Sequence, residues 1–252
     1  WRTIFFLGVV ESLQRRFSDA ELRTWAFCGL SAGAVYALAL AIHMPHAELK
    51  ETLVACANAS RSSCCGVLGK GHNGHFGVLI TKLLYFLPEK DLVRRLHGRF
   101  AITFTHIVCG RPVAFQASDF ATRDELWDVM WGSGNVPGIT DLGCLVGKCL
   151  RVRGRLAFDG GFSAYGSYPL LPCRTLVYVR CCGTEDDNSL LVSTAAVPVH
   201  LIRPSCVQSV WSWNTVRTPA HSHAIDCAAA EAFGKAEALF ASWPTQHGTL
   251  SD

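Results

Sequence analysis

Residues 27–34 read Phe27-Cys28-Gly29-Leu30-Ser31-Ala32-Gly33-Ala34, a G-x-S-x-G run between a short apolar segment and a small-residue segment. This context predicts a strand, a tight turn and a helix, with the hydroxyl of Ser31 exposed at the turn as a nucleophile. Gly29 and Gly33 are expected to let the helix pack closely on the strand, where a side chain at either position would collide. The amides that begin the helix, starting at Ala32, would face a carbonyl on which negative charge develops. The stretch therefore predicts a serine that cleaves esters.

The same region admits a second interpretation. Trp25 to Ile42 carries no formal charge and is long enough for a membrane span. Two glycines and a serine interrupt this run early, however, and no basic flank follows it. A strand of about four residues, a turn and a helix of about ten residues explain the same run. We therefore expect a strand-turn-helix rather than a span.

The composition indicates a large core. Half of the 252 residues are hydrophobic and 17% are charged, and the mean hydropathy is +0.23, which favours a surface with apolar patches that meets lipid. The formal net charge of +3 is too small to predict a nucleic-acid partner. None of the twelve cysteines forms a C-x-x-C pair, so no structural zinc is expected. Most cysteines are interpreted as small buried side chains in a reducing compartment.

Two histidine pairs have the spacing of helical metal ligands. They are His43 with His46 and His72 with His75. Neither pair has a clear third ligand, and a metal site is therefore not expected.

Hydrophobic periodicity predicts helices and strands in alternation. We expect helices over residues 4–16, 48–60, 78–87, 91–97, 123–131 and 224–243, and strands over residues 24–28, 100–108, 113–116, 155–158 and 175–180. Strands that alternate with helices indicate an α/β sandwich around one mainly parallel sheet.

A serine nucleophile needs a base, and two kinds of candidate lie downstream. Asp159 follows a predicted strand and precedes Gly160 and Gly161. Such a turn would leave its carboxylate at the carboxyl end of the strand, where ligands bind in open α/β sheets. The competing interpretation is an ordinary Asp-Gly turn with a solvent-facing carboxylate. A Ser-His-Asp triad would instead use one of the downstream histidines, His200, His221 or His223.

The ordered motifs of the chain resemble those of patatin-like phospholipases, whose signature is a G-x-S-x-G elbow followed by a D-G-G turn. Residues 6–10 are similar to the first helix of that family, residues 118–126 to its S-x-F-x-S-[KR]-[DE]-E-L stretch, residues 133–137 to its S-x-x-[IV]-P segment, and residues 158–163 to its V-D-G-G-x-S turn. The resemblance runs from Trp1 to roughly Gly183 and is greatest to the branch that contains adipose triglyceride lipase.

This resemblance implies a patatin-like three-layer α/β sandwich over residues 1–183 and a C-terminal extension, partly helical, over residues 184–252. Ser31 would be the nucleophile and Asp159 the base of a Ser-Asp dyad, with no metal and no organic cofactor. The implied function is hydrolysis of carboxylic ester bonds of triacylglycerol or phospholipid through an acyl-enzyme. The implied protein is cytoplasmic and peripheral on a membrane or lipid droplet, with a lipid substrate and no nucleic-acid partner.

Two departures from the family pattern bear on activity. The oxyanion loop of the family, G-G-G-x-[KR]-G, precedes the first helix, and residues 1–3 cover only its tail, with Arg2 on the basic position. The resemblance thus implies a chain truncated at this loop, and each missing oxyanion donor costs about a hundredfold to a thousandfold in rate. Residues 164–169 are longer than the D-N-x-P continuation of the family and lack its Asn. The alternatives that stay open are a Ser-His-Asp triad esterase and a catalytically impaired lipid-surface protein.

Overall fold

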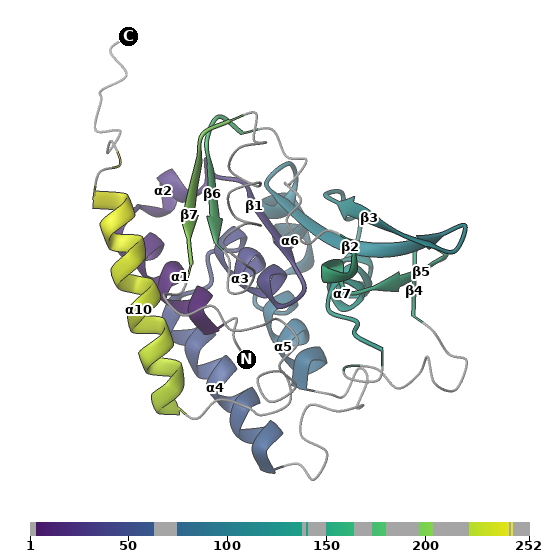
Figure 1. The fold of residues 1–252 in the computed structure, drawn as a ribbon, viewed down its shortest axis with the longest axis horizontal. Coiled ribbons are helices and arrows are strands. Elements are labelled where there is room, and N and C mark those ends of the chain that lie inside the picture. Colours follow the sequence, from purple (N-terminus) through teal and green to yellow (C-terminus); the bar gives the residue numbers. More distant parts are fainter. Residues whose placement is uncertain are drawn as a thin grey trace.

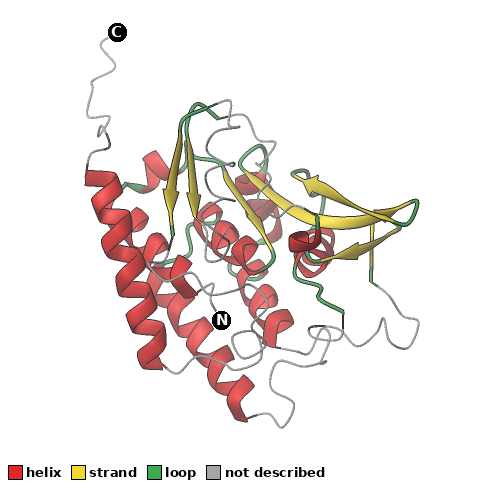
Figure 2. Ribbon diagram, in the orientation of Figure 1, coloured by secondary structure: helices red, strands yellow, loops and turns green. Residues whose placement is uncertain are grey.

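The computed structural model describes residues 4–62, 75–137, 140, 150–163, 173–179, 197–203, 222–241 and 243. Its helices and strands form an α/β sandwich (Figure 1 and Figure 2), which confirms the predicted fold class. The helices are α1 (Phe5–Arg16), α2 (Asp19–Leu22), α3 (Ala32–Ala41), α4 (His46–Ser62), α5 (His75–Leu84), α6 (Glu89–Leu96), α7 (Arg123–Ser133), the 3-10 helix η4 (Gly160–Phe162) and α10 (Ser222–Ala241). The strands are β1 (Phe27–Leu30), β2 (Phe100–Val108), β3 (Arg111–Ala117), β4 (Arg151–Val152), β5 (Arg155–Phe158), β6 (Leu176–Val179) and β7 (Val199–Ile202).

The long strand β2 organises the five-stranded sheet. β1 runs parallel to residues 100–103 of β2, and β5 runs antiparallel beside Thr105 and His106. β3 pairs antiparallel with β2 from Ile102 to Val108. Since β3 shares partners on β2 with both β1 and β5, the latter two strands must lie on the other edge of β2. Their carboxyl ends therefore meet head to head, opposite residues 103–105.

The strand directions are mixed. The expected parallel pairing is found for β1 with β2 and for β6 with β7, which form a separate two-stranded sheet. β2 and β3 are the two arms of a hairpin that turns at Cys109 and Gly110, with φ angles of 50° and 74°, and the arms of a hairpin are antiparallel by construction. β4 and β5 form a second antiparallel pair.

Helix α3 is buried on nearly every side, since residues 34–41 are all buried. A Cβ on Gly29 would lie 2.4 Å from the Cα of Ala34, so the close packing of β1 and α3 requires glycine there. A Cβ on Gly33 would meet only the ring of Phe6, at 3.3 Å, so the predicted collision is with backbone at Gly29 and is only a tight side-chain contact at Gly33. The strand-turn-helix accounts for the uncharged run. Within the described ranges, no helix is long and apolar enough to cross a membrane.

The C-terminal helix α10 belongs to the same core as α1, along which it lies (Figure 1). A Cβ on Gly8 of α1 would lie 1.9 Å from the carbonyl oxygen of Ala229, so the two helices touch backbone to backbone. The ring of Phe240 is fully buried and meets Phe17 edge to face, with ring centroids 5.5 Å apart. The expected boundary after residue 183 falls between β6 and β7, which pair with each other.

Side chains of the segment that resembles the family's S-x-F-x-S-[KR]-[DE]-E-L stretch fix the start of α7. The hydroxyl of Thr122 accepts the N–H of Glu125 at 3.1 Å, and the Glu125 carboxylate accepts the N–H of Ala121 at 2.8 Å. Arg153, in the β4–β5 turn, donates to Glu125 at 2.8 Å and to the Asp119 carbonyl at 2.7 Å. These contacts hold the N-terminal end of α7 against the β4–β5 hairpin. The C-terminal end of α7 lies at the junction of β1 and β5.

The described cysteines differ from the expectation that most cysteines are buried. Cys56 is buried and Cys28 is half-buried, whereas Cys109, Cys173 and Cys227 are exposed, and all five are free thiols. The prediction is therefore wrong for the last three, because they lie in a turn, before β6 and on the outer side of α10 rather than under the sheet.

Candidate active site

Ser31 occupies the turn between β1 and α3. Its φ of 52° and ψ of −136° are a conformation that side chains rarely adopt, and such strain persists only where the surroundings hold it. Serine at a helix N-cap usually accepts a hydrogen bond from the first turn, but the side chain of Ser31 makes no such bond. Its hydroxyl is therefore not occupied by the helix that it begins.

Asp159 follows β5, at the place where β1 and β5 meet. Its residue is only 7% exposed, so it is not the solvent-facing Asp of an ordinary turn. Its carboxylate accepts the N–H of Gly161 at 2.7 Å, and the side chain of Ser31 lies near enough to lower the pKa of the carboxyl group. The structure thus brings together the two side chains on which the sequence prediction of the site depends.

Burial raises the pKa of Asp159 from 3.8 to about 6, because removal from water disfavours the charged carboxylate. The nearby Ser31 side chain and the hydrogen bond from the Gly161 amide lower this pKa and so limit the shift. A carboxyl group that titrates near 6 is ionised at neutral pH and is still basic enough to take a proton during a reaction.

The backbone of Asp159 is fixed on both sides. Its N–H donates to the carbonyl of Asn135 at 2.8 Å. Its carbonyl accepts the hydroxyl of Thr105 at 2.8 Å, and that hydroxyl also lies 2.7 Å from the hydroxyl of Ser163. The carboxylate therefore projects from an anchored turn.

The two positions after Asp159 are glycine for different steric reasons. A Cβ on Gly160 would lie 2.6 Å from the carbonyl oxygen of Thr103 and 3.0 Å from Leu30, so this residue must be glycine for the turn to sit against β2 and β1. A Cβ on Gly161 would lie 3.0 Å from the Asp159 carboxylate that its own N–H binds. Both glycines thus allow the observed turn.

Ser133, the last residue of α7, connects the elbow to β2. Its hydroxyl accepts the N–H of Ser31 at 2.8 Å and donates to the carbonyl of Thr103 at 2.6 Å, and the residue is fully buried. The sequence prediction gave no role to Ser133, Asn135 or Thr105. The available signal was a Gly-Ser-Gly-Asn run at a helix end and a threonine inside an apolar strand, both of which place polar groups where burial demands a partner.

The first turn of α3 is the described part of the site that could face a developing oxyanion. The amides of Ala32 and Gly33 belong to this turn, whose N–H groups have no partner within the helix and carry the positive end of its dipole. Arg2, which the resemblance places in the oxyanion loop, and residues 164–169 lie outside the described residues.

Of the three histidine candidates for a triad, His200 is the one whose side chain the structure describes, and none of its described contacts is with Ser31. His200 lies on β7 with its ring 4.9 Å from that of Trp243. His221 and the side chain of His223 lie outside the described residues. His106, which is buried, has its Nδ1 bonded to the carbonyl of Leu156 at 2.8 Å.

The first histidine pair with metal-ligand spacing faces separate carboxylates. His43 lies 3.5 Å from Asp19 and His46 lies 3.6 Å from Glu11. The second pair, His72 and His75, lies outside the described side chains. No cluster of three or more His, Cys, Asp or Glu residues suited to a metal occurs in the described part of the chain.

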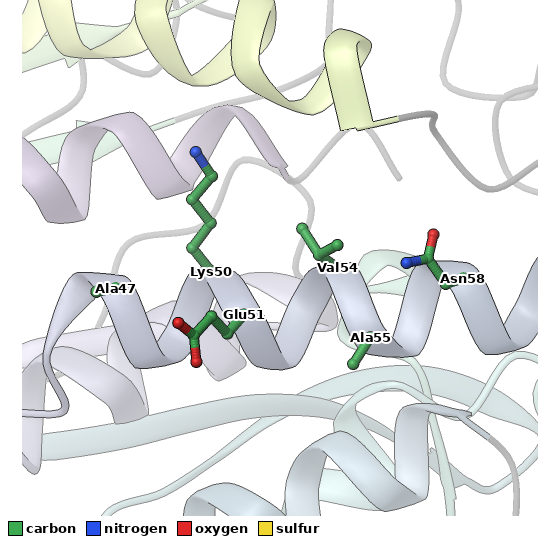
Figure 3. A pocket seen from close by; sticks show the side chains of 6 residues that line it. All are labelled: Ala47, Lys50, Glu51, Val54, Ala55 and Asn58. Carbon is green, nitrogen blue, oxygen red and sulfur yellow. The ribbon is translucent and has the colours of Figure 1, made fainter.

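A pocket of about 490 Å³ lies elsewhere, on α4 (Figure 3). It is lined by Ala47, Lys50, Glu51, Val54, Ala55 and Asn58. Lys50 and Glu51 point in different directions from the helix (Figure 3), and Lys50 pairs with Asp226 of α10 at 2.7 Å. Since none of the lining residues belongs to the elbow or to the Asp159 turn, this pocket is separate from the candidate active site.

Comparison with known proteins assigns the family. The family profile described as patatin-like phospholipase matches residues 1–171 of this chain. A search of curated proteins gave no match. Among solved structures, the type III effector protein ExoU is similar with a TM-score of 0.43 and 14% identity; the match covers 94% of this chain and 50% of that one, so this chain spans half the length of that structure. With the elbow and the D-G-G turn both inside residues 1–171, the chain belongs to the patatin-like phospholipase family.

Proposed function

We propose that this protein is a lipid acyl hydrolase that uses Ser31 as nucleophile and Asp159 as base. Membership of the family supports hydrolysis of lipid acyl esters as the general class of activity. The observation that carries the finer assignment is that Ser31 follows β1 and the buried Asp159 follows β5 where these strand ends meet, with the Ser31 side chain near enough to lower the pKa of Asp159. A nucleophile within reach of a base is the arrangement that activates a hydroxyl.

In the proposed reaction, the Ser31 oxygen attacks the ester carbonyl while its proton passes to Asp159. The tetrahedral intermediate then collapses, and Asp159 gives this proton to the leaving alcohol, so that an acyl-enzyme remains on Ser31. Water attacks the acyl carbonyl with Asp159 again as base, and its proton returns to Ser31 as the fatty acid leaves. The Ala32 amide at the start of α3 would stabilise the oxyanion, together with the segment at Arg2.

The proposed substrate is a long-chain acyl ester of glycerol, either triacylglycerol or phospholipid, taken from a membrane or lipid-droplet surface by a peripheral cytoplasmic protein. The high apolar content of the chain supports contact with such a surface. The resemblance to the adipose triglyceride lipase branch favours triacylglycerol, and the family description favours phospholipid.

The experiment is release of fatty acid from phosphatidylcholine vesicles and, in parallel, from a trioleoylglycerol emulsion. Covalent labelling by a fluorophosphonate, in which the Ser31 oxygen displaces fluoride from phosphorus, provides a second readout. Ser31→Ala and Asp159→Asn should abolish both. Ser18→Ala is the matched control, because Ser18 caps α2 away from the site, and it should keep both.

The outcomes separate the alternatives. Activity that survives Ser31→Ala would exclude a serine hydrolase. Activity that survives Asp159→Asn and is lost in a His221 or His223 variant would favour the triad esterase. Binding to vesicles by a chain that neither hydrolyses nor labels would favour the catalytically impaired lipid-surface protein.

A further inference from the structure

We propose that residues 132–135, Gly-Ser-Gly-Asn at the end of α7, form a clamp that holds the backbones of Ser31 and Asp159 in fixed positions relative to each other. The inference rests on the proposed function, since that function makes the two residues a dyad. Ser133 and Asn135 are then positioning residues, each acting through a backbone group of one dyad member rather than on the substrate.

The clamp is needed because of the way the strands meet. In the pairings of the described strands, β1 and β5 each pair with β2 and not with one another. Where β1 ends, Ser31 departs from ordinary backbone geometry with a positive φ. Strand pairing therefore provides no direct hydrogen bonds between the two strand ends, and α7 bonds to both of them.

Ser133 is the half of the clamp that holds the elbow. Its one hydroxyl binds the Ser31 N–H and the Thr103 carbonyl at once, at 2.8 and 2.6 Å. Thr103 is the partner of Leu30 in the β1–β2 ladder. At Ser31, where β1 leaves the sheet, the Ser133 hydroxyl therefore bridges backbone groups of the two segments that are paired up to that point. Without it, the Ser31 N–H and the Thr103 carbonyl would both lose this partner at a half-buried position.

Asn135 is the half that holds the base. Its carbonyl accepts the Asp159 N–H at 2.8 Å, and its side-chain amide donates to the Ala157 carbonyl at 3.0 Å. The residue is fully buried, and these two bonds hold it against the C-terminal end of β5. Asn135 thus fixes the direction in which the Asp159 side chain leaves the strand.

The glycines on either side of Ser133 allow the clamp to pack closely against the side chains of neighbouring elements. A Cβ on Gly132 would lie 2.8 Å from the side chain of Val152, and a Cβ on Gly134 would lie 2.3 Å from the ring of Phe76. The segment is therefore pressed between β4 and α5, and its position relative to the sheet is not adjustable without moving those side chains.

The test compares Ser133→Ala with Ser133→Thr, which keeps the hydroxyl, and with Ser12→Ala as matched control. Ser12 is also fully buried, and its hydroxyl donates to Glu237 at 2.6 Å, but it lies on the α1–α10 contact. Two readouts are taken on each chain. One is amide hydrogen exchange at Ser31, relative to Ala34, whose N–H bonds the Ser31 carbonyl. The other is the split between kcat and KM in the fatty-acid assay, with the fluorophosphonate labelling rate beside it.

Ser133→Ala should speed exchange at Ser31 but not at Ala34, and should lower kcat and the labelling rate by roughly tenfold to a hundredfold with KM within about twofold, since misplacement by about 1 Å has effects of this size. Ser133→Thr should restore both readouts, and Ser12→Ala should leave both unchanged. Asn135→Ala should shift the pH midpoint of labelling, because the turn that carries Asp159 is released.

Unchanged exchange at Ser31 and unchanged kcat in Ser133→Ala would overturn the clamp. Equal losses in Ser12→Ala and Ser133→Ala would also overturn it, since the effect would then be general destabilisation. A wild-type chain that neither labels nor hydrolyses would overturn the proposed function instead, and exchange at Ser31 would still decide whether Ser133 holds the elbow.

Discussion

Ser31 and Asp159 lie at the point where β1 and β5 end against each other on one edge of β2, and the Ser31 side chain lowers the pKa of the Asp159 carboxyl. A parallel strand and an antiparallel strand on the same edge direct their carboxyl ends toward a single place. Residues that follow the two strands therefore meet although they are far apart in the sequence. Because of this topology, the two members of the proposed dyad meet with no other strand between them.

The pH dependence of the reaction should follow the Asp159 carboxyl. Because its pKa is raised to about 6, kcat/KM and the labelling rate are expected to rise about tenfold per pH unit below that value and to level off above it. Steady-state rates from pH 4.5 to 8.5 measure the midpoint. A midpoint near 4 or a rate that keeps rising beyond pH 8 would assign the titration to another group.

Asp159→Asn should make the protein more stable at neutral pH while it abolishes activity. The folded chain holds the Asp159 proton more tightly than the unfolded chain, so its contribution to stability is present below pH 3.8 and is lost as pH rises through about 6. The Asn variant does not ionise and should gain up to about 3 kcal/mol over wild type at pH 7.5 relative to pH 4. Urea unfolding at the two pH values checks this, and an equal difference at both would contradict it.

The two glycines of the elbow should respond differently to alanine. In Gly29→Ala the new methyl meets the α3 backbone at 2.4 Å, and we expect a loss of about 3 kcal/mol or more. In Gly33→Ala it meets only the Phe6 ring at 3.3 Å, and the change should stay within about 1 kcal/mol. Denaturant midpoints of both variants provide the measurement, and similar losses would show that the helix and strand are less closely packed than described.

The contact between α1 and α10 should be essential to the folded domain. Gly8→Ala drives a methyl into the Ala229 carbonyl at 1.9 Å, whereas nothing lies within 4 Å of a Cβ on Gly234 in the same pair of helices. We expect Gly8→Ala to destabilise by about 3 kcal/mol or more and Gly234→Ala to stabilise by about 0.5–1 kcal/mol. Thermal unfolding distinguishes them. If removal of residues 184–252 left the unfolding transition unchanged, α10 would be dispensable for the core.

The sequence predicted the local structure around Ser31 and before Asp159. The Gly-x-Ser-x-Gly run around Ser31 predicted a strand, a turn and a helix, and β5 was predicted with its observed bounds before Asp159. Both signals are local, because a glycine beside a close backbone contact and a β-forming run before an Asp-Gly turn depend on nearby residues. The twenty-residue helix α10 was likewise placed to within two residues at each end.

Local sequence did not indicate the burial of Asp159, the roles of Ser133 and Asn135, or the contact of α10 with α1. The amino-acid sequence by itself determined the elements, the elbow glycine and the two residue types that the proposed chemistry needs. Only the tertiary structure decided that β1 and β5 share one edge of β2, that Asp159 loses water there and so titrates near 6, and that one hydroxyl of α7 bonds the elbow. The reason is that desolvation and hydrogen bonding between distant segments depend on which surfaces the whole chain buries together.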